Sequence, residues 1–489
     1  MIREFLGKSI FFGVITVISR SAAVISLLVL PYILDPSAYG ALAMISLTSM
    51  FVLAMVPLQI TQGLARYYST GPAGERERYV ATAWLFTLLQ YGLFLAISMP
   101  LTGPISELLF AGSGSEIRSY QMAMPTALLA IVSNGLFFFV QTQLRWSMRT
   151  GGFAAVSIIY SFLTLGLSVG LGAAADHPFR GVITGQLLAA LIATAIGIWL
   201  LRKSLATRFD RKKFQEMALF SLPLVPGSLF VFIIGSASRI ALNGVGTLAD
   251  VGVYTFANQI AGLATLSIVG IQGALAPLVM ANFDKPETPA TLGSFFEGFT
   301  AFAACLCLGL GLFSNDLIRL IGSPGYAEAS ELVLLLAPAL IIAEMYIFSP
   351  GFFIAKRTTR QMWVSAVGAA VSLGLAYPLS AAWGVHGAAV AALLGSIAFF
   401  MSWFLAAQPL YPVPVRWGRV GIFCAVAIGL GFAGVHVRFE SVLPSLAFKA
   451  ALVVAALVAA VGSGLFPAAR IYAAARRRRA ASARRDLGH

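Results

Sequence analysis

The sequence predicts an all-α polytopic membrane protein of about fourteen transmembrane helices, arranged as two parallel six-helix bundles followed by two further helices. Three observations predict this class. The 489 residues are 59% hydrophobic and only 11% charged, with a mean hydropathy of +0.87. The apolar residues fall into separate runs of about 20 residues, the length that crosses a bilayer as a helix. Landmarks also recur between two halves of the chain.

Each predicted span is an apolar run bounded by loops that hold charged residues, Gly or Pro. The runs cover residues 9–34, 39–64, 80–101, 120–143, 152–173, 181–201, 218–242, 252–280, 292–313, 331–354, 362–382, 385–407, 417–436 and 445–466. They divide the chain into four parts, which are a first six-helix lobe, a second six-helix lobe, a pair of C-terminal helices and a basic tail. These parts are residues 1–210, 211–410, 411–466 and 467–489.

The basic residues set the orientation. Most of the 33 Lys and Arg residues fall on one set of loops together with both ends of the chain. The opposite loops hold only Arg118, Arg180, Arg319, Arg438 and Lys449. Because cytoplasmic loops carry the excess of Lys and Arg, we expect both termini in the cytoplasm. The net charge of +14 is then explained by topology and lipid headgroups, and nucleic acid is not an expected partner.

Several landmarks recur at an offset of about 212 residues, which indicates an internal repeat. The turn that ends in Gly40 opens the second span, and a similar turn that ends in Gly252 opens the eighth. Pro125 in span four corresponds to Pro338 in span ten. Six spans per half is an even number, so both halves have the same orientation in the membrane. In such transporters the substrate site lies between the two halves.

Two arginines lie deep inside apolar runs. Arg20 falls within the first span and Arg239 within the seventh. A charge at mid-membrane depth costs roughly 2.5–3.5 kcal/mol on insertion scales, so it is tolerated where it faces water or a partner. We therefore expect both to line a cationic cavity for an anionic substrate, with pairing to a buried acid or to helix-end carbonyls as the alternative.

Four further charged residues are candidates for the same path. Arg66 and Arg145 end spans two and four on the cytoplasmic side, where they would capture substrate or simply reach the lipid headgroups. Glu297 and Glu344 are the acids inside predicted spans, and each is either a coupling site for H⁺ or Na⁺ or a structural acid. No cofactor, metal site or catalytic constellation is expected. The chain has no Gly-x4-Gly-Lys-Ser/Thr loop, so ATP hydrolysis is not expected and the chain is predicted not to be an enzyme.

Short motifs in a fixed order carry a family resemblance. They are Ser19-Arg20 followed by Pro31-Tyr32-Ile33-Leu34, the turn Asp35–Gly40, Gly63–Tyr68, Val251–Tyr254 with Ala257, and Trp383–Ala389. Over essentially the whole chain the sequence resembles the multidrug/oligosaccharidyl-lipid/polysaccharide (MOP) exporter superfamily, and within it the Wzx-type polysaccharide flippases. The resemblance implies a V-shaped, MATE-like fold. It also implies transport of undecaprenyl-pyrophosphate-linked oligosaccharide repeat units from the cytoplasmic to the periplasmic leaflet.

The resemblance leaves alternatives open. A lipid II flippase of peptidoglycan synthesis would share the spans and the cationic cavity. A MATE-type multidrug antiporter would favour an acidic cavity, and a membrane-embedded glycosyltransferase or polymerase would need a larger loop than the sequence contains. For the flippase reading the expected partners are membrane lipids, the lipid-linked oligosaccharide, and polysaccharide polymerase and chain-length proteins.

Overall fold

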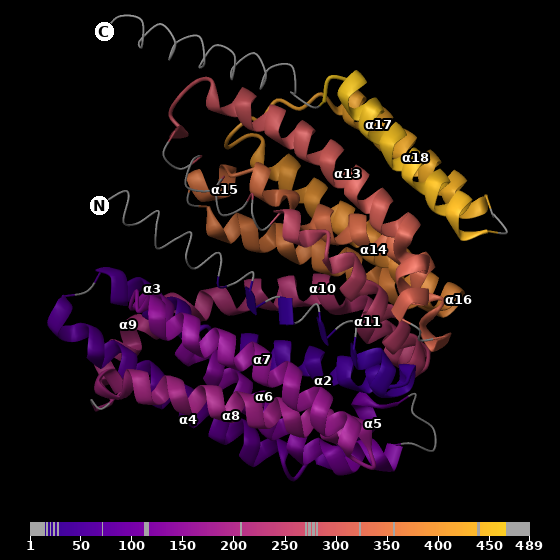
Figure 1. Ribbon diagram of the computed structural model, residues 1–489. Coiled ribbons are helices and arrows are strands. Elements are labelled where there is room, and N and C mark those ends of the chain that lie inside the picture. The colour runs from indigo at the N-terminus through magenta and orange to yellow at the C-terminus, as the bar shows by residue number, and fades with distance from the viewer. Residues whose placement is uncertain are drawn as a thin grey trace, which may run out of the picture. The chain divides into compact units, whose positions relative to one another are not determined.

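The computed structural model describes residues 15–465 apart from short gaps, and every regular element in the described part is a helix. The gaps are residues 16–17, 20, 23–24, 27–28, 71, 112–116, 206–207, 269–270, 272–274, 276–278, 280–281, 322–323, 356 and 438–440. Figure 1 shows the long helices. Twelve helical runs in the described residues are long and apolar enough to cross a membrane. The predicted all-α polytopic fold is therefore confirmed, while half of the predicted first span, including Arg20, lies outside the described residues.

The longest helix contains two of the predicted spans. α16 (Thr358–Ala407) has 50 residues. At 1.5 Å per residue it would be about 75 Å long if straight, well over the ~30 Å hydrocarbon core. Its backbone leaves helical geometry at Trp383 and Gly384, and Gly384 has φ +55° and ψ −133°. The break falls between predicted spans eleven and twelve, so the twelve runs correspond to predicted spans two to fourteen once α16 is divided.

The chain packs as two compact units. One consists of Met1–Phe256, Ile321–Tyr326 and Ala369–Ala392, and the other of Ala257–Leu320, Ala327–Gly368 and Leu393–His489. This division follows spatial contacts, whereas the predicted lobe boundary at residue 210 follows the sequence repeat. The compact units therefore do not test the repeat, and the pair of six-helix lobes stays a prediction.

The first unit is built on a bundle of long helices. They are α2 (Pro36–Met55), α3 (Ile60–Thr70), α4 (Arg76–Ser98), α5 (Thr102–Leu109), α6 (Ile117–Trp146), α7 (Thr150–Ala174) and α8 (Pro178–Leu205). α6, α7 and α8 pack side by side (Figure 1). The approach of α8 to α7 is close because a Cβ on Gly181 would lie 2.2 Å from the Leu171 carbonyl oxygen. Apolar side chains such as Val140, Leu144 and Val156 form the core between these helices.

Two antiparallel spans of the first unit are interrupted at the same level. The short helix α9 (Arg211–Ser221), the 3₁₀ turn Leu222–Leu224 and α10 (Val225–Val245) form the predicted seventh span. α2 packs on α10 and α3 packs on α9, so the seventh span runs antiparallel to the second. The second span breaks between Met55 and Ile60, where Leu58 and Gln59 have φ of +49° and +55°. Pro57 in one break and Pro223 in the other remove backbone donors, which explains why both helices stop there.

The second unit contains the remaining long helices. They are α13 (Thr288–Ile321), α14 (Ala329–Glu344), α15 (Gly351–Ile354), α17 (Trp417–His436) and α18 (Val442–Gly462), together with both ends of α16. α17 and α18 form a packed pair, drawn in yellow in Figure 1. Their inner faces meet α13 in an apolar cluster that includes Cys305, Leu312, Phe423 and Ala456. α11 (Leu248–Gly262) begins in the first unit and ends in the second.

Candidate functional site

Arg239 occupies the middle of α10, inside a run of apolar and small residues. Its guanidinium donates a hydrogen bond to the Gly235 carbonyl one turn earlier, with Nη2 3.1 Å from the oxygen. Tyr254 of α11 lies close enough to interact with its charge. Within the described residues no carboxylate lies within ion-pair distance of Arg239. A guanidinium carries five N–H donors, so most of its hydrogen-bonding capacity is available to another group.

The helix that carries Arg239 is held in place from several sides. Ser238 donates a hydrogen bond to the Ala388 carbonyl of α16, at 2.8 Å. Asn243 donates to the Leu108 carbonyl of α5, at 3.0 Å. These polar contacts fix the rotation of α10 about its axis. The position of the guanidinium is therefore set by the packing of the helix and not by an acidic partner of its own.

Arg20, the other deep arginine, lies outside the described residues. Its neighbour Ser19 is helical. Whether Arg20 and Arg239 face one common cavity stays a prediction from the sequence.

Arg66 lies in the middle of α3 and Arg145 lies in the last turn of α6; both are exposed, and the two helices contact each other. The Arg66 guanidinium lies over the Phe220 ring, 4.5 Å from its centroid. The Arg145 guanidinium lies 5.3 Å from the centroid of the Phe153 ring. Aromatic faces hold both cations by cation–π attraction. Arg66 and Arg145 thus lie on neighbouring helices of the first unit, and headgroup contact and substrate capture both stay predictions.

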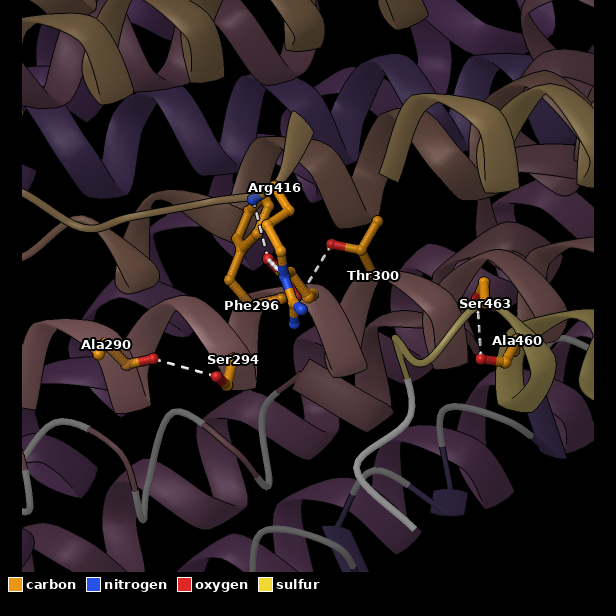
Figure 2. A network of polar contacts seen from close by, with 8 residues as sticks. Ala290, Ser294, Phe296, Thr300, Arg416, Ala460 and Ser463 are labelled. Carbon is orange, nitrogen blue, oxygen red and sulfur yellow. Dashed lines mark hydrogen bonds and ion pairs between the residues drawn. The ribbon is translucent and has the colours of Figure 1, made fainter. Parts of the chain in front are cut away.

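Glu297 is a buried acid of the second unit that is paired with Arg416. It is 2% exposed, and its carboxylate accepts two hydrogen bonds from Arg416 Nε at 3.1 and 3.0 Å, one from Nη2 at 2.6 Å and one from the Arg416 backbone N–H at 2.8 Å. Figure 2 shows Arg416 beside the turn of α13 that carries Phe296 and Thr300. A carboxylate bonded in this way has little capacity left for a transported ion, so the geometry favours the structural reading of Glu297.

Glu344 lies where a span is interrupted. α14 ends at Glu344, a 3₁₀ turn covers Met345–Phe348, and α15 follows after Ser349 and Pro350. Trp403 donates to the Ser349 carbonyl at 3.2 Å, and the Ser349 hydroxyl is buried with no hydrogen-bond partner in the described structure. Interrupted membrane helices expose backbone groups that bind substrates and ions in many transporters. Coupling through Glu344 therefore stays a prediction.

Sequence reasoning treated two lysines only as markers of topology, and both form ion pairs. Lys213 of α9 is 9% exposed and pairs with Glu75, next to a hydrogen bond between Tyr79 and Glu216. The bond from Lys213 holds the pKa of the Glu75 carboxyl below its ordinary value. Lys449 of α18 pairs with Asp316 of α13, with 2.5 Å between Nζ and Oδ2. Each pair joins residues more than a hundred positions apart, so spacing along the chain could not have indicated them.

The arrangement of helices is that of known membrane transporters. The fold is similar to that of a lipid II flippase, MurJ, in an inward closed conformation, with a TM-score of 0.72 over 91% of this chain and 98% of that chain at 13% identity. It is similar to an inward-facing multidrug resistance MATE family transporter of the MOP superfamily, with a TM-score of 0.63 over 80% and 93% at 14% identity. The Vibrio cholerae MATE transporter VcmN in its bent form gives 0.54 over 83% and 97% at 14% identity.

These likenesses define the class of protein, a multi-pass membrane protein with the fold of MOP superfamily transporters. The sequence profile described as polysaccharide biosynthesis protein matches residues 29–331. The chain belongs to this polysaccharide biosynthesis protein family. No curated protein sequence matches it.

Proposed function

We propose that the protein is a flippase that moves polyprenyl-pyrophosphate-linked oligosaccharide from the cytoplasmic to the periplasmic leaflet of a bacterial inner membrane. Family membership supports a role in polysaccharide synthesis, and the transporter fold supports movement of a substrate across the bilayer. The sugar needs a hydrated path because it is polar, while the lipid tail can stay in the bilayer. Polysaccharide polymerase and chain-length proteins are the proposed partners that use the product.

One observation carries the proposal at the level of chemistry. Arg239 lies within a membrane span and has no acidic partner in the described structure. Arginine keeps its charge in a membrane and binds phosphate through two parallel N–H groups. A lipid pyrophosphate is a compact anion that could pair with the Arg239 guanidinium. A carrier of organic cations would gain nothing from a positive charge at this place.

A lipid II flippase is the second candidate, and the likeness to MurJ favours it. Both substrates present a polyprenyl pyrophosphate, so Arg239 cannot separate them. Loss of lipid II transport leads to lysis, whereas loss of a surface polymer is survivable. Depletion of the protein in growing cells therefore decides between the two: lysis would support the lipid II flippase, and survival without surface polymer would support the oligosaccharide flippase.

The test of the anion site is a set of substitutions at Arg239. Arg239→Ala should lower export of surface polymer about tenfold or more, because charge-assisted hydrogen bonds to an ionised group contribute about 1.5–3 kcal/mol each. Arg239→Lys should retain part of the export, because the charge remains while the paired donors are lost. Export is measured as radiolabelled sugar incorporated into cell-surface polymer in a strain that lacks the native gene.

The matched control is Arg180→Ala, which removes an exposed arginine from the first turn of α8. It should leave both membrane insertion and export unchanged. If Arg239→Ala inserts normally and exports polymer at the control rate, the anion site is not at Arg239.

We propose that the transport cycle is driven by an H⁺ or Na⁺ gradient, with Glu344 as the coupling acid. The position of Glu344 at the interruption of a span supports this proposal, and the closed ion pair of Glu297 directs it to Glu344 alone. The coupling ion itself stays open.

A further inference from the structure

Two helices from the two halves of the sequence repeat cross at a pair of glycines. Gly40 lies in the first turns of α2, and Gly252 lies in the first turns of α11. A Cβ on Gly40 would lie 1.8 Å from the Leu248 carbonyl oxygen, and a Cβ on Gly252 would lie 2.0 Å from the Pro36 carbonyl oxygen. Both distances are far below van der Waals contact, so only glycine allows the two backbones to approach this closely.

The contact is reciprocal. Gly40 and Gly252 are 212 positions apart, and so are the residues that they meet, Pro36 and Leu248. The Cβ built on each glycine also lies 3.0 Å from the backbone nitrogen of the other. A contact in which one residue meets a second and their repeat equivalents meet in return is the signature of a two-fold axis. The pseudo-two-fold axis of the repeat therefore passes through this crossing.

Aromatic side chains close the space beside the crossing. Tyr39, Phe256 and Tyr326 are 2%, 0% and 0% exposed. The Tyr39 ring centroid lies 6.2 Å from that of Phe256 and 5.8 Å from that of Tyr326. Tyr326 donates a hydrogen bond to the Leu34 carbonyl at 3.0 Å, which ties the turn before α14 to the start of α2. Among the described residues, backbone contact and buried rings therefore fill the space between the first turns of α2 and α11.

We infer that the Gly40–Gly252 crossing is a separable contact that closes the transport path at the end of the molecule where the Asp35 and Thr247 turns lie. This inference rests on the proposed transport function. A path between two repeat halves runs along their pseudo-two-fold axis, and alternating access opens that path at one end at a time. A backbone contact on the axis blocks the path while it is closed. The contact must open before a bulky lipid-linked sugar can leave on that side.

The direct test is a reversible cross-link across the contact. Tyr39→Cys and Phe256→Cys are combined in a protein whose native cysteines, Cys305, Cys307 and Cys424, are replaced by Ala. The pair is joined by a short bifunctional methanethiosulfonate. Cross-linking should reduce polymer export to background, and a reducing agent should restore it. Full cross-linking with unchanged export would overturn the inference, because a contact that never opens is not a gate.

The matched control joins two rings within one repeat half. Tyr120→Cys and Phe179→Cys link α6 to α8 at a site where the rings are 4.8 Å apart. This cross-link should leave export unchanged. The untreated double variants must export polymer first. If they and the parent protein do not, the proposed function has failed, and the contact is then judged by the second measurement alone.

The second measurement needs no transport. Tyr39→Cys should react slowly with a membrane-impermeant maleimide because the position is buried. Gly40→Ala or Gly252→Ala should raise that rate several-fold, because the added methyl group forces the backbones apart. Gly262→Ala is the control on the same helix, since a Cβ there would meet no atom within 4 Å. An unchanged rate in a folded Gly40→Ala or Gly252→Ala protein would contradict the inference.

Discussion

At the scale of single residues, charge inside the membrane separates into two kinds. Arg239 has one weak bond to its own helix, whereas Glu297 and Lys449 are closed into ion pairs. The sequence singled out Arg239 and Glu297, because a charge in an apolar run is conspicuous, and it counted Lys449 only as a marker of topology. It could not tell which were paired, since the partners of Glu297 and Lys449 come from distant helices. Distinguishing a charge in an ion pair from one without a carboxylate partner therefore required the structure.

The two candidate coupling acids can be separated by the same conservative change. Glu297→Gln should lower the free energy of unfolding by about 1 kcal/mol, because a neutral amide replaces a charge-assisted acceptor for a half-exposed arginine. It should keep polymer export. Glu344→Gln should abolish export that depends on the ion gradient. Thermal unfolding in detergent and labelled-polymer export measure the two effects, and normal export by Glu344→Gln would remove Glu344 from the coupling mechanism.

At the scale of elements, length and hydropathy placed the spans well, while breaks within them were less predictable. Pro57 and Pro223 lie at helix interruptions, yet Pro125 and Pro338 lie inside the continuous helices α6 and α14. A proline removes one backbone donor in every case, but neighbouring helices decide whether the chain unwinds or bends. The sequence therefore showed where a helix could be distorted, but it did not show whether the helix is interrupted or continues through the proline.

The break in α16 at Trp383 and Gly384 allows a test of what interrupts a helix. Gly384 has φ +55°, and a Cβ on Gly387 would lie 1.8 Å from the Leu379 carbonyl oxygen. Gly384→Ala should lower the free energy of unfolding by about 1–3 kcal/mol through backbone strain alone, because the space around it is open. Gly387→Ala should be destabilising through the collision. Gly374→Ala in the same helix meets no atom within 4 Å and should be neutral or stabilising, since Ala exceeds Gly in helix propensity by about 1 kcal/mol. Thermal unfolding in detergent ranks the three, and equal effects would contradict the assignment of the bend.

At the scale of the whole molecule, the repeat and the positive-inside pattern predicted more than any single motif. The repeat offset read from two similar turns reappears as the reciprocal contact of Gly40 and Gly252. The all-α transporter fold is confirmed, and the placement of both termini in the cytoplasm stays a prediction. The sequence could not show that helices of the second repeat half pack within the first compact unit, because compactness depends on contacts that are distant along the chain.

Topology can be tested with two exposed glycines that have open space around them. Gly74 precedes α4, and Gly103 lies in α5. In intact spheroplasts an impermeant maleimide should label Gly103→Cys and should miss Gly74→Cys until the membrane is permeabilised. The reverse labelling pattern would contradict the predicted orientation and would indicate that both termini lie outside the cytoplasm.

The α9 helix changes what counts as half of this protein. By sequence it opens the second repeat half, yet it docks on α3 and α4 through Lys213 with Glu75, and Ser221 accepts a bond from the Gly63 N–H at 3.1 Å. The start of the predicted second half therefore packs on helices of the predicted first half. A chimaera joined after Ser221 keeps α9 with its native partners α3 and α4. One joined before Arg211 places a foreign helix against α3 and α4.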